Sequence, residues 1–350
     1  MRVLVLGGSW FVGRAVVDAV AAGGHDVAVF NRGVTPAPLP GGVQRIAGDR
    51  ESAADVRALA RYGPWDVVID VSGSIPAVVR RNAQVLADVA GHCALVSTIS
   101  AYRDWPHAEV DEESAVWDAA ADDDPGVRRW DPDAYGPLKV GCEIASEEAF
   151  GAQRLLVLRP HVVLGPYEYV GRLPWWLGRM RRGGQVLAPG PDRAIQPVDA
   201  RDLAIFLLEC VETRKSGLFN VAPQPEAATY GGMLQACIEA TAGSAERPVD
   251  LVWADEDWLM GQGVTQWTEL PLWRNAAAPW GMKVDRAHAV GLRCRPLADT
   301  VGDTWAWLRD GGRAVEHERF AEHGIAPGKE SAITGWWLDR AEGGHRSGSS

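Results

Sequence analysis

The stretch Val3-Leu4-Val5-Leu6-Gly7-Gly8-Ser9-Trp10-Phe11-Val12-Gly13 decides the fold that this sequence predicts. Its first part, residues 3–6, is a short and unbroken apolar run, which is typical of a strand buried on both faces of a parallel sheet. Apolar residues at helical spacing follow over residues 14–20, and Gly23-Gly24 mark the end of this helix. A glycine turn between a strand and a helix lets a pyrophosphate approach the backbone at the positive end of the helix. We therefore predict a dinucleotide site at this turn.

A second apolar run, Val27-Ala28-Val29-Phe30, follows at the distance expected of a βαβ unit and ends at Asn31-Arg32. NAD sites commonly carry an acidic residue here that binds the ribose 2′-hydroxyl, whereas an arginine suits the 2′-phosphate of NADP. Asn31 and Arg32 therefore favour NADP as the cofactor, with NAD as the alternative. The competing interpretation is that Arg32 is a solvated strand-end arginine in a Rossmann-like domain of another purpose.

The composition of the whole chain restricts its partners. The chain has 350 residues, about two domains by length, and a net charge of −11, which disfavours nucleic acid and anionic membranes as partners. The sequence contains no apolar run near the roughly 20 residues of a transmembrane helix and no signal-peptide core. The five cysteines are scattered without a CxxC pair, so we predict neither a disulfide framework nor a metal site. We expect a cytoplasmic protein with a small-molecule substrate, and a homodimer is an open alternative.

Strands and helices alternate along the first half of the chain. The predicted segments are strands at 43–47, 65–70, 93–98 and 154–159 and helices at 55–62, 76–90 and 135–150. Such alternation is typical of parallel sheets with helices on both faces. We therefore predict an α/β fold with a Rossmann-like, doubly wound parallel sheet, whose ligand lies at the carboxyl ends of the strands.

The segments at about 166–194 and 223–340 predict a smaller, mixed C-terminal substrate domain, and an acidic segment within the dinucleotide-binding part precedes them. Residues 105–134 are acidic and contain proline, so we expect a solvated loop, with a lid as the alternative. The later predicted segments are an excursion rich in Gly, Pro, Trp and Arg at 166–191, strands at 195–199 and 217–221, helices at 201–211 and 230–241, and a Trp-rich stretch with few turns of helix to about 308. The dinucleotide-binding domain is then 1–165 plus about 195–222, the substrate part about 166–194 plus 223–340, and 341–350 a disordered tail.

Tyr135 and Lys139 stand four residues apart at the start of a predicted helix, so they lie on one face and can reach a single bound molecule. A lysine ammonium beside a phenol favours the charged phenolate, which makes a tyrosine a better acid and base near neutral pH. Thr98 ends a predicted parallel strand, where its hydroxyl could hold a substrate oxygen. These three residues are the candidate catalytic residues.

Taken together, the motifs resemble those of the short-chain dehydrogenase/reductase superfamily, of the extended or atypical NAD-dependent epimerase/dehydratase kind. The likeness runs from residue 1 to about residue 310, and it rests on several motifs in the family's order. They are the glycine turn at 7–13, the active-site strand at 96–102, the YxxxK motif at 135–139, the loop beside the nicotinamide at 158–166 and the strand-helix signature at 196–204.

The resemblance implies roles for particular residues. It makes Tyr135 the acid/base, Lys139 its partner that also binds the cofactor ribose, and Thr98 the substrate-orienting hydroxyl, with Ser100 as its rival. It implies that Asp49 contacts adenine and that Ser72-Gly73 pass the ribose. The full set of implied cofactor-binding residues is Gly7, Ser9, Trp10, Phe11, Val12, Gly13, Asn31, Arg32, Asp49, Arg50, Ser72, Gly73, Pro160 and Val163. In two respects this sequence departs from the family: Trp10 replaces the central glycine of the turn, and the acidic insertion lengthens the interval from Thr98 to Tyr135.

These observations predict an NADP-dependent oxidoreductase, a reductase that moves hydride between nicotinamide and a carbonyl or alcohol carbon while Tyr135 moves the proton. One alternative is a nucleotide-sugar epimerase or dehydratase with tightly bound NAD(P). Another is a non-catalytic or RNA-binding member, like the chloroplast stem-loop RNA-binding proteins, against which the charge of −11 and the intact motifs argue. The candidate substrate residues are Ser100, Arg172, Trp175 and Gln196; for Arg172 and Trp175, core packing explains the sequence equally well.

Overall fold

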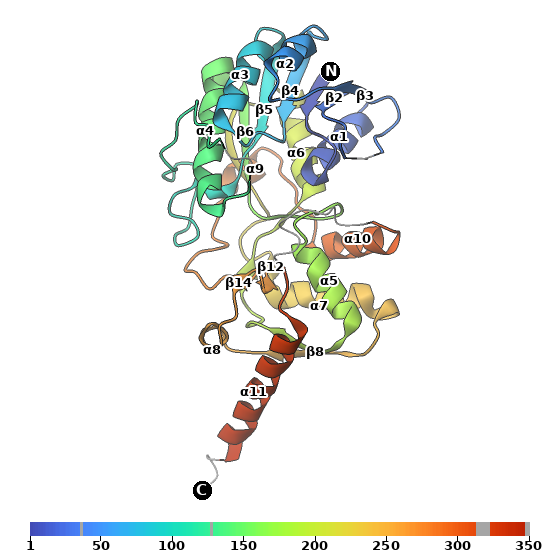
Figure 1. Ribbon diagram of the computed structural model, residues 1–350, viewed down its shortest axis with the longest axis vertical. Helices are drawn as coiled ribbons and strands as arrows, with labels where there is room; N and C mark the ends of the chain where they lie inside the picture. The colour runs from blue at the N-terminus through green and yellow to red at the C-terminus, as the bar shows by residue number, and fades with distance from the viewer. Residues whose placement is uncertain (36–37, 127–128, 313–322, 347–350) are drawn as a thin grey trace. The chain divides into compact units, whose positions relative to one another are not determined.

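The structure is a computed structural model that describes residues 1–35, 38–126, 129–312 and 323–346 (Figure 1). The chain divides into two compact units. The first unit comprises Met1–Val163, Gln196–Pro225 and Trp280–Arg295, and the second comprises Leu164–Ile195, Glu226–Pro279 and Pro296–Ser350.

A seven-stranded parallel sheet forms the centre of the first unit, in the order β11-β6-β5-β4-β1-β2-β3. Its strands are β1 (Arg2–Leu6), β2 (Asp26–Asn31), β3 (Gln44–Ala47), β4 (Trp65–Asp70), β5 (Ala90–Val96), β6 (Leu155–Pro160) and β11 (Gly217–Val221). The strand order reverses between β1 and β4, which is the topological switch point where doubly wound folds bind ligands. The predicted Rossmann-like fold class is confirmed.

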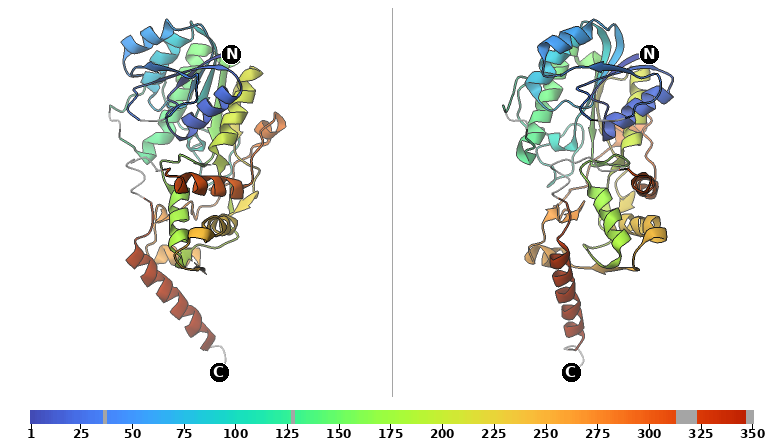
Figure 2. Two further views of the ribbon diagram at one scale, coloured as in Figure 1. Left: turned by 90° about the vertical axis from the view of Figure 1, so that its right-hand side faces the viewer. Right: turned by 45° about the vertical axis from the view of Figure 1, so that its right-hand side comes forward.

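Helices cover both faces of this sheet (Figures 1 and 2). The elements on one face are α1 (Phe11–Ala22) and α6 (Ala200–Glu212), and those on the other are α2 (Ala53–Ala60), α3 (Pro76–Leu86) and α4 (Pro132–Phe150). Alternate residues of β1 point to opposite faces, so Val3 and Val5 pack under α1 while Leu4 and Leu6 pack under α3. Because both faces are covered, the central strands are mainly apolar, as the sequence indicates.

The second unit is mixed α and β. Its helices are α5 (Arg172–Arg182), α7 (Tyr230–Thr241), α8 (Glu256–Gly261), α10 (Leu297–Arg309) and α11 (Pro327–Arg346). Its strand pairs are β8 (Gly184–Ala188) with β13 (Val249–Trp253), β9 (Ala194–Ile195) with β12 (Ala228–Thr229), and β14 (Gln266–Trp267) with β15 (Leu270–Pro271). The shorter remaining elements of the chain are η1 (Ile99–Ala101), η2 (Ala152–Arg154), β7 (Val163–Leu164), β10 (Val198–Asp199), η3 (Ala242–Ser244) and α9 (Asp285–Ala289).

Several predicted elements differ from the structure. The helix predicted over 76–90 ends at Leu86, because the chain must turn before Ala90 enters the ladder opposite Trp65. Gln196-Pro197 divides the strand predicted at 195–199 into two short strands. In the stretch predicted to have few helical turns, α10 is a helix of 13 residues. The predicted disordered tail is helical up to Arg346, and 347–350 lie outside the described residues.

Two segments differ from the setting that the sequence predicts for them. Residues 280–295, predicted in the substrate part, lie in the first unit. The acidic segment, predicted as a solvated loop, is attached to the first unit through Val110, whose N–H donates to the carbonyl of Gly281 at 2.9 Å. Val110 is buried, and the carboxylate of Glu112 accepts the backbone N–H of Asn220 at 3.0 Å. The acidic segment is therefore not entirely solvated, because Val110 within it is buried and attaches it to the first unit.

Among the described helices, none combines the length and apolar character that a membrane crossing needs.

Candidate functional site

The turn after β1 requires its glycines. Gly7 and Gly8 have φ of 107° and 85°, in the region that favours glycine over all other residues. A Cβ on Gly13 would stand 2.8 Å from the backbone nitrogen of Gly8, so only glycine lets α1 pack this closely on the turn. The backbone is thus shaped as a dinucleotide turn requires.

The start of α1 suits an anion. Its N-cap residue, Trp10, makes no side-chain cap hydrogen bond, and the first turn, which the structure describes in full, has no acidic residue. The positive end of the helix dipole and the first amides of a helix attract phosphate when no side chain competes for them. Trp10, which replaces the family's central glycine, is therefore compatible with the helix start although its ring adds bulk beside the turn.

Asn31 and Arg32, at the end of β2, have different roles. The Asn31 Nδ2 donates to the carbonyl of Gly7 at 3.1 Å and to the Ser9 hydroxyl at 3.0 Å, so Asn31 supports the glycine turn. Arg32 is exposed directly beyond it. Arg32 thus directly follows the residue that supports the turn, and its contact with a 2′-phosphate stays a prediction.

An ion pair joins the ends of β3 and β4. Arg50 donates to both carboxylate oxygens of Asp70, at 2.9 and 2.6 Å, and to the Ser72 hydroxyl at 2.5 Å. Burial would raise the pKa of Asp70, but the charge and hydrogen bonds of Arg50 outweigh burial and hold that pKa below its usual value. Asp49, the predicted adenine contact, accepts the backbone N–H of Glu51 at 2.8 Å and is half-buried.

The helix α4 carries Tyr135 one turn from its start and Lys139 one turn further. Lys139 is 5% exposed, and its Nζ donates to the carbonyls of Gly73 at 2.6 Å and Val96 at 2.7 Å. The lysine therefore connects α4 to the loop after β4 and to the end of β5. Tyr135 is half-buried, with its ring centroid 4.8 Å from that of Trp130.

Thr98 and Ser100 follow the end of β5, the strand end to which Lys139 of α4 is hydrogen-bonded. The Thr98 hydroxyl oxygen accepts the backbone N–H of Ser100 at 3.2 Å and caps the short helix η1. Gly136, next to Tyr135, lies directly against the Ser100 carbonyl, where a Cβ would collide with it. The structure thus brings the strand end with Thr98 and Ser100 together with the start of α4, as the motifs predict.

A buried polar network behind this site was not predicted. Glu143, one turn after Lys139 on α4, accepts a hydrogen bond from the Ser97 hydroxyl and forms an ion pair with Arg159 of β6 at 2.5 Å. The Arg159 guanidinium lies 4.6 Å from the ring centroid of Tyr102, and burial raises the pKa of Tyr102 to about 12. Two features of the sequence could have revealed this network. Arg159 stands inside an apolar run that is predicted as a strand, and Glu143 follows Lys139 by one helical turn. A buried charge needs a partner, so the two residues could have been paired.

The loop after β6 contributes an aromatic stack. His161 is buried, with its ring 4.7 Å from Trp280 at an interplanar angle of 15°. Its Nδ1 accepts the backbone N–H of Val162 at 2.7 Å. Pro160, the predicted nicotinamide neighbour, is buried as the last residue of β6, and Val163 is half-buried two residues beyond His161.

The remaining candidate substrate residues lie in different surroundings. Gln196 is fully buried in the first unit, and its amide donates to the carbonyls of Pro223 and Met282 and accepts the N–H of Met282. Arg172 and Trp175 lie on α5 of the second unit. The Arg172 guanidinium is 4.9 Å from the Trp267 ring centroid, and Trp175 packs edge-on against Trp176. The amide of Gln196 is thus engaged by backbone groups, and the substrate roles of all three residues stay predictions.

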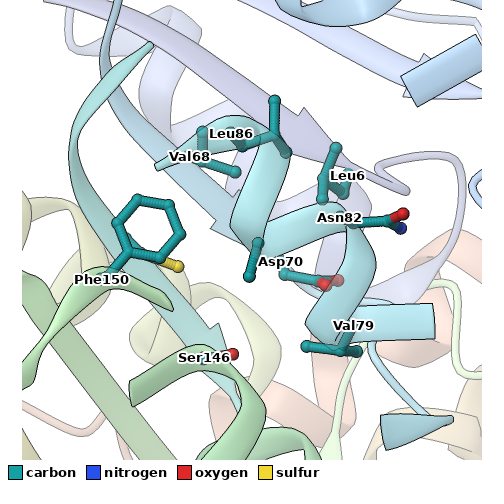
Figure 3. A pocket seen from close by; sticks show the side chains of 10 residues that line it. Leu6, Val68, Asp70, Val79, Asn82, Leu86, Ser146 and Phe150 are labelled. Carbon is teal, nitrogen blue, oxygen red and sulfur yellow. The ribbon is translucent and has the colours of Figure 1, made fainter. Parts of the chain in front are cut away.

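A small cavity lies beside Asp70, between the sheet, α3 and α4 (Figure 3). The space open to the centre of a water molecule is about 10 Å³, which is close to the minimum for one water and too small for a substrate. Asn82 lines it and is 2% exposed, and neither polar atom of its amide has a hydrogen-bond partner among the described residues.

Comparisons with known proteins agree with the motifs. Residues 3–104 match the model of the family described as NAD dependent epimerase/dehydratase family. The chain is 24% identical over 257 residues to the chloroplast stem-loop binding protein of 41 kDa b of Arabidopsis thaliana, a match that covers 68% of this chain and 63% of that protein. It is 47% identical over 73 residues to 2'-dehydrokanamycin reductase of Streptomyces kanamyceticus, which covers 21% of this chain and 20% of that protein. The chain thus spans less than two thirds of either curated relative.

Solved structures share the fold along most of the chain. The Bordetella bronchiseptica enzyme WbmH in complex with NAD+ is 16% identical, with a TM-score of 0.68 over 89% of this chain and 99% of that chain. UDP-glucose 4-epimerase of Thermotoga maritima with UDP-glucose is 18% identical, with a TM-score of 0.63 over 89% of this chain and 99% of that chain. Residues 3–104 are therefore similar to the NAD dependent epimerase/dehydratase family, and the chain shares the fold of these solved structures along most of its length.

Proposed function

We propose that this chain is an NAD(P)-dependent enzyme of the epimerase/dehydratase type, which oxidises and then re-reduces a small-molecule substrate, a sugar nucleotide, while it retains its cofactor. The observation that carries the proposal is the position of Lys139. Its two hydrogen bonds, to Gly73 and Val96, attach the helix of Tyr135 to the strand ends at the switch point. This attachment supports a role for Tyr135 as the acid/base, because the strand ends at the switch point are where this fold class binds its ligand.

The residues of the turn fit a dinucleotide. Gly7, Gly8 and Gly13 provide the close backbone approach, and the start of α1 provides the positive end of a helix dipole. Ser72-Gly73 lie beyond β4, across the switch point from the turn. When bound, NAD(P) supplies a nicotinamide that accepts or returns a hydride.

The chain's own residues handle the proton. In the oxidation step the phenolate of Tyr135 accepts the proton of the substrate hydroxyl, and a hydride leaves the carbon that bears this hydroxyl. In the reduction step the phenol of Tyr135 returns that proton to the carbonyl oxygen. The Thr98 hydroxyl, whose oxygen is already held by the Ser100 N–H, donates to the substrate oxygen and orients it. General acid/base catalysis of this kind contributes typically about 10² to 10⁴-fold to the rate.

A second candidate is a reductase that exchanges NADP(H) at every turnover. Two observations favour it: the exposed Arg32 beyond β2, which suits a 2′-phosphate, and the similarity of part of the chain to 2'-dehydrokanamycin reductase. The chemistry at Tyr135 is shared by both candidates. They differ in whether the cofactor leaves.

A binding role toward RNA is the weaker candidate. The Arabidopsis relative is named for binding stem-loops, but this chain has a net charge of −11, and affinity for a nucleic-acid backbone comes mainly from cationic side chains.

The five cysteines, at 93, 142, 210, 237 and 294, are free thiols in the structure, which supports a reduced, cytoplasmic setting.

The test separates these candidates. Purified protein is denatured, the released dinucleotide is identified by mass spectrometry, and native protein is assayed with UDP-glucose and with UDP-glucuronic acid. Retained NAD(P) and turnover without added cofactor support the epimerase or dehydratase. Steady reduction of added NADP⁺, with oxidation of a hydroxyl carbon of either sugar nucleotide, supports the oxidoreductase that exchanges its cofactor. Protein that neither retains nor binds a dinucleotide contradicts the proposal.

A further inference from the structure

The ion pair of Arg50 and Asp70 spans the edge of the sheet at which the dinucleotide is expected. Arg50 follows β3 and Asp70 ends β4, although these strands are separated by β2 and β1 in the sheet. The side chains of Arg50 and Asp70 are 19% and 7% exposed. A bidentate pair at this depth fixes both partners in direction as well as in distance.

Ser72 extends the connection to a third strand end. Its hydroxyl accepts from Arg50 at 2.5 Å and donates to the carbonyl of Leu6, the last residue of β1, at 3.1 Å. Its backbone N–H donates to Asp70 at 2.9 Å. The loop after β3, the end of β4 and the end of β1 are therefore held by a single set of side chains.

This set lies on the adenosine side of the crevice. The pyrophosphate belongs at the start of α1, and the residues that follow β2 face the ribose in this class of fold. The loop after β3 is the next one out from the switch point. We propose that Arg50, Asp70 and Ser72 form a clamp that shapes the adenosine side of the crevice before the cofactor arrives, and that Arg50 is a positioning residue rather than a phosphate ligand. This inference rests on the proposed function, because it requires a dinucleotide in the crevice.

The charge distribution explains why Arg50 does not select the 2′-phosphate. Both of its terminal nitrogens are engaged by Asp70, and a phosphate would have to displace a paired carboxylate. Arg32 is exposed and follows Asn31, which hydrogen-bonds to the turn, so it can contact a phosphate without that loss. The clamp should therefore affect NADPH and NADH alike, whereas Arg32 should distinguish between them.

The experiment measures the dissociation constants of NADPH and NADH for the full chain by fluorescence titration. The variants are Asp70→Asn, Arg50→Gln, the double variant that removes both charges, and Arg32→Gln. The control is Arg57→Gln, which removes an exposed arginine from α2, the helix that follows the clamp loop. Thermal unfolding is recorded for every protein. The double variant leaves no buried charge without its partner, so it folds even where a single variant does not.

We expect all three clamp variants to weaken NADPH and NADH by the same factor, about 3- to 10-fold, since an unfixed loop must be ordered on binding. Arg57→Gln should leave both affinities unchanged, and Arg32→Gln should weaken NADPH alone. Loss of NADPH affinity alone in Arg50→Gln would make Arg50 a phosphate ligand and overturn the proposal. If the double variant binds both dinucleotides with wild-type affinity but is less stable, the ion pair stabilises the fold and does not shape the cofactor site, which would also overturn the proposal. If wild-type protein binds neither dinucleotide, the proposed function fails, and the clamp with it.

Discussion

The ammonium group of Lys139 donates to the carbonyl oxygen of Val96, the last residue of β5, at 2.7 Å. This bond attaches α4 to the strand end that continues into Thr98. Lys139 therefore has a structural role in addition to the cofactor contact that its motif implies.

Replacement of Lys139 by Met should lower both stability and cofactor affinity. The change removes two buried, charge-assisted hydrogen bonds, and bonds to charged groups typically contribute about 1.5 to 3 kcal/mol each. We expect a lower melting temperature together with at least about tenfold weaker NADPH binding. Lys283→Met, at an exposed site of the same unit, is the control. A Lys139→Met protein with wild-type affinity would exclude the cofactor contact.

Tyr135→Phe should remove turnover and leave cofactor binding nearly intact. The variant loses one hydroxyl and keeps the ring that packs against Trp130. The expected fall in kcat is about 10² to 10⁴-fold, the usual contribution of an acid/base group. Tyr62→Phe, at a residue that is 45% exposed, controls for the loss of a phenol elsewhere. Wild-type turnover in Tyr135→Phe would show that another group moves the proton.

Arg32→Ala should weaken NADPH binding and leave NADH binding unchanged. A charge-assisted contact with the 2′-phosphate contributes about 1.5 to 3 kcal/mol, which corresponds to about 10- to 100-fold in the dissociation constant. The measurement is a paired titration of both dinucleotides. Equal affinities in the wild-type protein, or an unchanged preference in the variant, would remove Arg32 from the site.

Stability should fall at acidic pH in a way that depends on Asp70. Arg50 holds the folded-state pKa of Asp70 below its unfolded value of about 3.9. The stabilisation is therefore fully present above the unfolded pKa and is lost as pH falls through the folded one. We expect urea unfolding between pH 7 and pH 3 to show a smaller acid-side decline in Asp70→Asn than in the wild type. Parallel declines in the two proteins would show that the pair contributes nothing to the pH dependence.

Asn82→Leu should raise stability. The amide is buried at the cavity in Figure 3 without a hydrogen-bond partner among the described residues, and a buried unsatisfied polar group costs about 1 to 3 kcal/mol. Leucine has a similar size and adds apolar surface beside Leu86 and Val79. The check is the denaturation midpoint. A lower midpoint in Asn82→Leu would show that the amide is satisfied in solution.

The sequence predicts the sheet and the glycine turn because both depend on local patterns. Buried parallel strands are continuous apolar runs, and residues that need positive φ, such as Gly7 and Gly8, are visible one by one. The positions of Thr98, Tyr135 and Lys139 follow from motif order. What the sequence does not show is which distant charges meet, since the pairing of Arg50 with Asp70 depends on the path of a loop across the sheet edge.

The helix α10 was missed for a different physical reason. Two of its three buried residues are threonines, Thr300 and Thr304, so little of the buried face is apolar. The available signal was the helical spacing of the apolar residues Leu297, Val301, Trp305 and Leu308. The acidic segment was predicted to be a solvated loop because most of its residues are polar or charged. Val110, a single apolar residue among them, is buried, and one residue forms no pattern. Patterns of hydrophobicity identify elements only where the buried face is apolar.

The most direct test of the central claim is a titration of NADPH and NADH against wild-type protein and Gly13→Val. A side chain at position 13 would collide with the backbone of Gly8, so the variant cannot keep the turn in its observed form. We predict that the wild-type protein binds at least one dinucleotide and that Gly13→Val, shown to be folded by circular dichroism, binds neither. Wild-type protein that binds neither, or a Gly13→Val protein that binds as tightly as the wild type, would contradict a dinucleotide site at this turn.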